Sequence, residues 1–124
     1  MGENGSSGVI VCRVGPDRFA LPVSAVREVV ATPPLAKLPG ASAAVRGVAN
    51  VRGALVTAVS GSVLLGHGAP APTEWLVVLT LRDGLVGLEV DEVEDLQSEG
   101  SHGLRVLDAE ALIRPLLALE TADD

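Results

Sequence analysis

The sequence predicts a mainly β protein of the barrel or sandwich type. Short runs rich in valine, leucine and isoleucine recur along the chain, and glycine, proline and aspartate separate them. Many runs carry apolar residues on both faces instead of strict alternation, which indicates strands shared between two packed lobes. With 124 residues the chain corresponds to one domain, and it is long enough to bury its own core.

Each predicted strand is bounded by residues that favour turns. Gly15-Pro16-Asp17 predicts the first hairpin turn, Arg52-Gly53 separates two later strands, and Asp83-Gly84 is a strong hairpin signal. The expected strands are residues 9–14, 18–21, 26–30, 45–51, 54–59, 74–81 and 85–90.

The segments between the strands predict short helical turns and irregular connectors. Residues 22–25 and 60–66 are expected to form brief helical turns. Residues 32–40 form an irregular connector because prolines remove donors and push the preceding residue out of the helical region. The glycine- and proline-rich residues 66–73 predict a loop.

The last part of the chain predicts additional strands followed by a helix. Residues 93–96 are expected to continue the sheet, and residues 104–107 are expected to form a final strand. Asp108 is the N-cap candidate of a helix over residues 108–119, and Pro115 is expected to kink or terminate it. Apolar side chains on this helix come from Ala109, Leu112 and Ile113.

Composition limits how the core is built. Hydrophobic residues make up 48% of the chain and aromatic residues only 2%, so valine, leucine and alanine must fill most of the core. Trp75 and Phe19 are the expected bulky anchors. Cys12 is the only cysteine and lies in a predicted strand, which excludes an internal disulfide and indicates a core filler.

Charge and the chain ends exclude several classes of partner. A net charge of −7 argues against a nucleic acid or an anionic membrane surface, because both attract clustered lysine and arginine. No apolar run reaches the roughly 20 residues that a membrane-spanning helix needs, and no export signal is recognised at the N-terminus. We therefore expect a cytoplasmic protein without direct membrane insertion, with residues 1–8 as a flexible tail.

The sequence does not predict an enzyme. It has no nucleophile elbow and no phosphate-binding glycine loop, and its only lysine is Lys37 in the connector. His67 and His102 have no carboxylate or second histidine at ligand spacing, so we expect no metal and no cofactor. A crowded group of acids is interpreted as a solvated face that strand alternation divides between two sides. It consists of Glu89, Asp91, Glu92, Glu94, Asp95 and Glu99.

Residues 45–53 are the most informative stretch, because they place two arginines and two glycines in an apolar, β-prone run. Arginine has a weakly hydrated, planar fork of donors that suits recognition of another protein, and glycine allows a strand to bulge or turn. The simpler interpretation is that the arginines only face water and the glycines only mark bends.

Four ordered blocks resemble the CheW-like family of bacterial chemotaxis adaptors. They are Val26-Arg27-Glu28-Val29, Leu38-Pro39-Gly40-Ala41, residues 45–53 and residues 87–93. They match a V-x-E-[IV] strand, a proline-bearing connector, a G-V-x-N-[LIV]-R-G segment and a G-[LI]-x-V-D-x-V strand. The resemblance covers roughly residues 9–114, which we take as the domain, with residues 115–124 as a C-terminal extension.

The resemblance implies a fold of two small SH3-like five-stranded β-barrel lobes that share a core, followed here by a short C-terminal helix. One departure matters. Only about ten residues separate Val93 from the strand expected at 104–107, where the family usually has a long loop and a further strand. The second lobe is therefore expected to be truncated, with an open edge strand that must be covered or paired.

The resemblance also implies a non-catalytic adaptor that couples a histidine kinase regulatory domain to the cytoplasmic tip of a chemoreceptor. It assigns recognition roles to Glu28 and Arg52, where Arg52 would bind a partner carboxylate bidentately and Glu28 would orient it. The alternative is an internal ion pair that fixes strand register, and both roles can coexist. The surface around the pair is expected to be shaped by Val26, Val29, Gly47, Asn50 and Gly53.

Further departures leave the pathway and two other functions open. After R-G the family typically has a proline and then an aspartate, but here the positions hold Thr57 and Ser60, so a turn and its carboxylate cap are expected to be lost. The pathway can be flagellar chemotaxis or a related gliding or twitching system. The alternatives are a self-associating structural domain, hence a homo-oligomer without kinase coupling, and a small-ligand-binding β-barrel.

Overall fold

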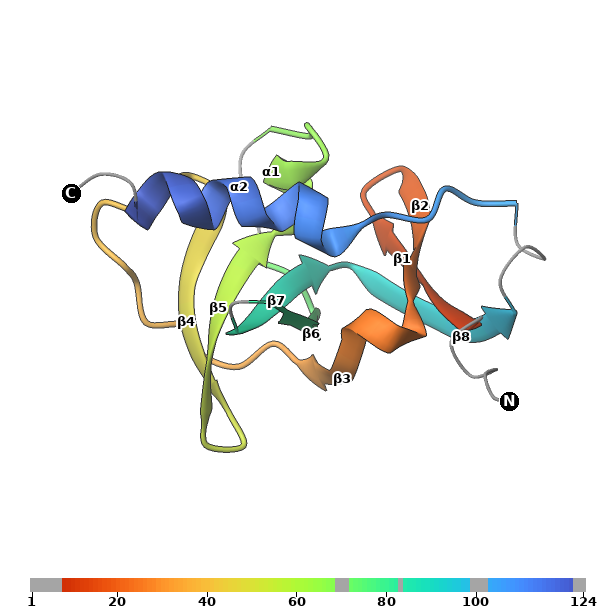
Figure 1. The fold of residues 1–124 in the computed structure, drawn as a ribbon, viewed down its shortest axis with the longest axis horizontal. Coiled ribbons are helices and arrows are strands. Elements are labelled where there is room, and N and C mark those ends of the chain that lie inside the picture. Colours follow the sequence, from red (N-terminus) through yellow and green to blue (C-terminus); the bar gives the residue numbers. More distant parts are fainter. Residues whose placement is uncertain (1–7, 69–71, 83, 99–102, 122–124) are drawn as a thin grey trace.

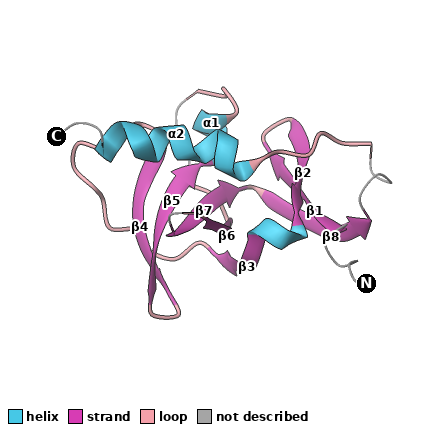
Figure 2. Ribbon diagram, in the orientation of Figure 1, coloured by secondary structure: helices cyan, strands magenta, loops and turns pink. Residues whose placement is uncertain are grey.

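The computed structural model describes residues 8–68, 72–82, 84–98 and 103–121, and its ribbon is shown in Figures 1 and 2. Within these residues the chain forms strands with three helical segments between or after them. The strands are β1 (Gly8–Val14), β2 (Asp17–Pro22), β3 (Val26–Ala31), β4 (Val45–Val51), β5 (Ala54–Ser60), β6 (Trp75–Leu81), β7 (Gly84–Val90) and β8 (Glu92–Ser98). The helical segments are η2 (Val23–Ala25), α1 (Gly61–Leu64) and α2 (Ala109–Thr121).

The strands form two sheets, which confirms the mainly β fold with two lobes. A five-stranded sheet has the order β3-β6-β7-β5-β4, and a three-stranded sheet has the order β2-β1-β8. All neighbours are antiparallel except β5 and β7, which run parallel. Among the described residues the second lobe therefore has fewer strands than the first, in agreement with the predicted truncation.

The crossing between the lobes differs from the sequence prediction. Residues 93–96 were expected to continue the sheet of the preceding strand, but β8 pairs with β1 in the other sheet. The chain changes sheets at Asp91, whose carboxylate accepts the Gly15 N–H at 2.7 Å. The Asp91 N–H donates to the Arg13 carbonyl at 2.9 Å, so this junction is fixed on both sides.

Two clusters of buried side chains form the core. The smaller cluster lies in the five-stranded lobe and contains Ala49, Val56 and Leu76. The larger cluster joins both sheets and α2, and includes the fully buried Phe19 as predicted. Trp75 packs only partly buried against it. Cys12 is buried, and desolvation raises the pKa of its thiol to about 12, as suits a core filler.

The C-terminal segment differs from the prediction in two ways. Residues 104–107 form only a single bridge, in which Ala20 exchanges two backbone hydrogen bonds of 2.9 Å with Arg105 and Leu107. The helix also continues through Pro115 to Thr121 instead of ending there. Proline removes only one N–H donor, and Ala109 and Ile113 anchor the part of the helix before it in the core. The domain boundary predicted between residues 114 and 115 falls inside α2 and stays a prediction.

Side chains cap the N-termini of both α1 and α2. The Asp108 side chain accepts the Ala111 N–H at 3.3 Å at the start of α2. The cap after β5 was expected to be lost, because Ser60 stands where the family has an aspartate, but the Ser60 hydroxyl accepts the Val63 N–H at 3.2 Å. The carboxylate is absent as expected, and a hydroxyl caps the helix in its place. The described helices include none with the length and apolar character needed to cross a membrane.

Candidate partner-binding surface

The hairpin of β4 and β5 extends away from the rest of the molecule and ends in a strained turn (Figure 1). Arg52 has a φ of 52° and Gly53 a φ of 87°. Positive φ at both central residues is typical of a type I′ turn, which matches the twist of the two strands. The Asn50 side-chain oxygen accepts the Gly53 N–H at 2.9 Å and stabilises the turn. A non-glycine residue in this conformation is uncommon, and such strain is often found at functional sites.

Arg52 links the two edges of the five-stranded sheet. β3 and β4 are the outer strands of that sheet, and the Arg52 Nε donates to the Glu28 Oε1 on β3 at 2.8 Å. The side chain of Arg52 is nevertheless 78% exposed, whereas that of Glu28 is 23% exposed. The hydrogen bond and charge of Glu28 raise the pKa of Arg52 above its ordinary value. The pair thus connects the two outer strands at the seam between β3 and β4, and it leaves the guanidinium open to solvent.

The predicted site residues divide into an accessible group and a supporting group. Glu28, Asn50, Arg52 and Gly53 lie together around the turn, and we call them the Arg52 surface. Val26 and Val29 are half-buried and pack against the core. Their predicted role in shaping the Arg52 surface stays a prediction.

Gly47 lies under the connector and is buried. Its φ is 145°, and a Cβ at this position would lie 2.5 Å from the Ala36 carbonyl oxygen. The connector is held there because Ala36 exchanges two backbone hydrogen bonds, of 2.9 and 2.8 Å, with Val48. Glycine is therefore required by close backbone approach, a packing reason that is distinct from contact with a partner.

A small hollow of about 210 Å³ adjoins Arg52 in the seam between β3 and β4. Its walls are partly apolar and partly polar. They are formed by Val30, Ala31, Pro33, Asn50, Val51 and Arg52. An exposed cation beside a partly apolar hollow is compatible with protein recognition, where arginine is enriched.

The second arginine of the same stretch is arranged differently. Arg46 lies in a bulge of β4 opposite β5, and its Nε donates to the Glu89 Oε1 at 2.9 Å. The side chain of Glu89 is only 1% exposed and that of Arg46 is 24% exposed. Burial raises the pKa of Glu89, and the charge and hydrogen bond of Arg46 oppose that rise. A bulge commonly redirects a side chain, and here it directs Arg46 to the buried carboxylate.

The interpretation of the acidic group as a solvated face is therefore wrong for Glu89. Its neighbours in β7 are buried, and that apolar run was the signal that this acid also faces inward. Glu92 pairs with Arg13 at 3.1 Å and Glu94 pairs with Arg18 at 2.7 Å across the three-stranded sheet. The hydrogen bond from Arg18 lowers the pKa of Glu94. Glu99 and the side chain of Asp95 lie outside the part that the structure describes.

His67 has a partner that its local sequence did not reveal. Its Nε2 lies 2.8 Å from the Asp17 Oδ2, which joins the loop after α1 to the start of β2. Among the described residues, no cluster of three or more histidine, cysteine or acidic side chains is arranged to hold a metal ion. His102 lies outside these residues.

A family model described as "CheW-like domain" matches residues 8–105. The chain belongs to the CheW-like domain family. Within the matched region of this CheW-like domain lie both members of the Arg52–Glu28 pair and both members of the Arg46–Glu89 pair. Helix α2 follows the matched region.

Two relatives support the family assignment. "Chemotaxis protein CheW" of Rhizobium meliloti (strain 1021) is 39% identical over 95 residues, which are 75% of this chain and 61% of that protein. "Probable chemotaxis protein CheW" of Rhizobium etli is 32% identical over 96 residues, 76% of this chain and 62% of that protein. The CheW-like domain thus spans about three fifths of the length of these relatives.

A solved structure has the same fold. The scaffolding protein TtCheW from Thermoanaerobacter tengcongensis superposes with a TM-score of 0.69 at 19% sequence identity, covering 77% of this chain and 64% of that one. At this identity the similarity concerns the fold alone.

Proposed function

We propose that this CheW-like domain is a non-catalytic adaptor in the cytoplasm that couples a chemotaxis-type histidine kinase to chemoreceptors. The observation that supports this most is the position of Arg52, whose side chain is 78% exposed at the tip of a protruding hairpin. The proposed pathway is chemotaxis, because both rhizobial relatives are named as chemotaxis proteins. The kinase regulatory domain is the proposed partner of the Arg52 surface, and the receptor tip is a second partner of the same assembly.

Burial and geometry explain why Arg52 suits recognition. An ion pair whose arginine is largely exposed contributes little to folding stability, so the Arg52–Glu28 pair acts mainly in binding. The contact with Glu28 uses the Nε, and within the described residues the guanidinium has no other hydrogen-bond partner. Its terminal amino groups therefore remain for a partner carboxylate, while Glu28 holds the side chain in one orientation. Orienting the side chain beforehand lowers the entropy cost of binding.

The test is a pull-down with the regulatory domain of the chemotaxis-type histidine kinase from the same organism. The informative variant is Arg52→Asp, and Arg27→Asp is the matched control because Arg27 is an exposed arginine adjacent to Glu28 on β3. We expect the kinase domain to retain the wild-type protein and the Arg27 variant and to lose the Arg52 variant. Equal retention of all three proteins would rule out the Arg52 surface as the kinase contact.

A second candidate function is self-association without kinase coupling. It is favoured by β8, an outer strand of the three-stranded sheet, which has no strand on its other side among the described residues. Unpaired strand edges recruit further strands. Light scattering after size exclusion distinguishes the candidates, because a dimer that persists on dilution supports self-association and a monomer supports the adaptor.

A further inference from the structure

The pair of His67 and Asp17 connects the two lobes. Asp17 begins β2 in the three-stranded sheet, whereas His67 follows α1, which continues directly from β5 in the five-stranded sheet. The two side chains meet at 2.8 Å between the His67 Nε2 and the Asp17 Oδ2. The arginine–carboxylate pairs described above each lie within one lobe, and their cations are Arg13, Arg18, Arg46 and Arg52. Compared with these pairs, the His67–Asp17 pair is the one that crosses from lobe to lobe.

The turn before Asp17 also contacts the point where the chain changes sheets. The Gly15 N–H donates to the Asp91 carboxylate at 2.7 Å, and the Arg13 guanidinium donates to the Gly15 carbonyl at 3.2 Å. A Cβ at Gly15 would lie 3.9 Å from the His67 Cδ2, so the imidazole lies beside this turn. The charged groups around the imidazole are therefore the carboxylates of Asp17 and Asp91 and the guanidinium of Arg13.

Two of these three charges are negative, and the positive one already has a carboxylate partner. The Arg13 Nε donates to the Glu92 Oε1 at 3.1 Å across β1 and β8. The surroundings of the imidazole thus favour its protonated, cationic form. A change in the charge of His67 acts at the junction between the lobes.

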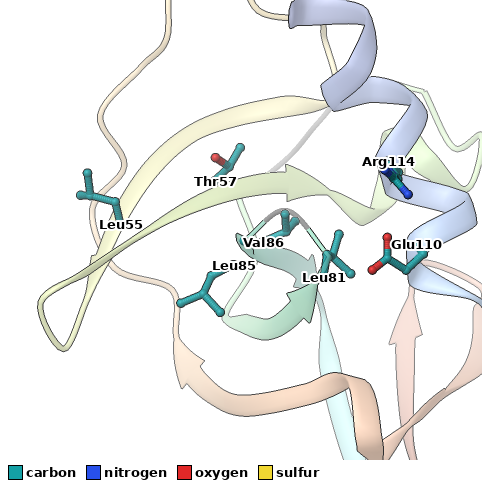
Figure 3. A pocket seen from close by; sticks show the side chains of 8 residues that line it. Leu55, Thr57, Leu81, Leu85, Val86, Glu110 and Arg114 are labelled. Atoms are coloured by element: carbon teal, nitrogen blue, oxygen red, sulfur yellow. The ribbon is translucent and has the colours of Figure 1, made fainter.

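A second connection between the lobes is made by α2 and the segment before it. Residues 104–107 bridge to Ala20 of β2, and Glu110 of α2 accepts the Arg82 N–H directly after β6. Between α2 and the strands β5 and β7 lies a cavity of about 250 Å³, and Glu110 and Arg114 line its α2 side (Figure 3). Side chains that line a cavity have no contacts on its open side. This connection is therefore less tightly packed than the core.

We propose that His67 and Asp17 form a pH-sensitive clasp between the two lobes, which is tightest when the imidazole is protonated. Histidine is the side chain that ordinarily changes its charge between pH 5 and 8. At the acid end of this range the pair is a charge-assisted hydrogen bond between an imidazolium and a carboxylate. As the pH rises the ring becomes neutral, and this contribution of the clasp is lost. Neither residue belongs to the Arg52 surface, so the proposal is independent of the proposed function.

The test is amide hydrogen exchange of the Gly15 N–H, recorded by NMR on the full chain at about pH 5.5 and about pH 7.5. Each rate is divided by the intrinsic rate at the same pH to give the protection. The chain has two histidines, so His102→Gln is the matched control for His67→Gln. The side chains of His67 and Asp17 are 27% and 40% exposed, and solvent therefore weakens the pair.

We expect a modest effect with a defined sign. In the wild type and in His102→Gln the protection of Gly15 should fall about twofold to fivefold from the lower to the higher pH. In His67→Gln and in Asp17→Asn it should not fall. The Val48 N–H, which donates to the Ala36 carbonyl within the five-stranded lobe, is the internal reference and should keep its protection.

Three results would overturn the clasp. The first is a Gly15 protection that does not change with pH in the wild type. The second is a fall that persists in His67→Gln or in Asp17→Asn. The third is an equal fall at Val48, because it would report a pH dependence of the whole fold, for which the buried Glu89 suffices.

Discussion

Arg46 and Arg52 belong to the same short stretch of sequence and form the same kind of ion pair, but their surroundings differ. Each donates its Nε to a glutamate oxygen, at 2.9 Å for Arg46 and 2.8 Å for Arg52. Glu89, the partner of Arg46, is 1% exposed, whereas Glu28, the partner of Arg52, is 23% exposed. The comparison shows that burial, and not the type of residue or bond, separates a structural ion pair from one available for recognition.

The physical basis is the cost of removing one partner. A buried carboxylate that loses its cation is left desolvated and uncompensated, which is strongly unfavourable. An exposed arginine that loses its carboxylate is hydrated by water instead. We therefore assign Arg46–Glu89 to the stability of the fold and propose Arg52–Glu28 for binding.

The largest predicted effect is on stability. Arg46→Ala leaves Glu89 without its cation and should lower the free energy of unfolding by about 3 kcal/mol. In urea unfolding this loss appears as a lower midpoint, while the slope of the unfolding free energy against urea concentration stays unchanged. Arg52→Ala is the matched control and should leave the midpoint where it is. Equal midpoint shifts for both variants would remove the distinction between the two pairs.

The two glycines of the same stretch sharpen the comparison. Gly47→Ala places a Cβ 2.5 Å from the Ala36 carbonyl oxygen, and we expect it to destabilise the fold by about 2 to 3 kcal/mol. Gly53 has a φ of 87° but no atom within 4 Å of its Cβ position, so Gly53→Ala should cost only about 1 kcal/mol of backbone strain. Thermal unfolding of both variants tests this order, and a larger loss for Gly53→Ala would contradict it.

A smaller effect should appear in the pH dependence of stability. Burial raises the pKa of Glu89 above its ordinary value of 4.5. The folded protein therefore holds this proton to higher pH than the unfolded chain does. The resulting stabilisation is complete below pH 4.5 and is lost as the pH rises through the folded pKa.

Glu89→Gln isolates this contribution, because glutamine does not titrate. The wild type should lose stability relative to the variant as the pH rises from about 4.5 upward. The lowered pKa of Glu94 acts in the opposite direction, and it is present in both proteins and cancels in the difference. Parallel stability curves would show that the burial of Glu89 has no effect on its protonation.

Local patterns in the sequence predicted most of the fold. Turn residues and β-prone runs located the strands of the five-stranded sheet, because hairpin formation depends on neighbours in the chain. The α2 helix extends beyond Pro115, where the proline predicted a kink or an end, while Ala109 and Ile113 anchor its first part in the core. The partner of His67 could not be predicted, because Asp17 is brought to it only by the packing of distant segments.

The candidate site was predicted in part. The resemblance assigned Glu28 and Arg52 to one surface, and the structure joins them by a hydrogen bond across the seam of the lobe. The burial of Glu89 was missed, although the apolar run around it in β7 favours an inward orientation. The cavity at α2 was missed as well, because its walls come from three elements that only the fold brings together.

The most direct test follows the two arginines in one titration. Isotope-labelled protein is titrated with the unlabelled kinase regulatory domain, and the Nε–H resonances of Arg46 and Arg52 are recorded by NMR. We predict that the Arg52 resonance and the backbone signals of Asn50 and Gly53 shift or broaden, while the Arg46 resonance does not change. A shift of Arg46 without a shift of Arg52 would contradict the assignment of the exposed pair to binding.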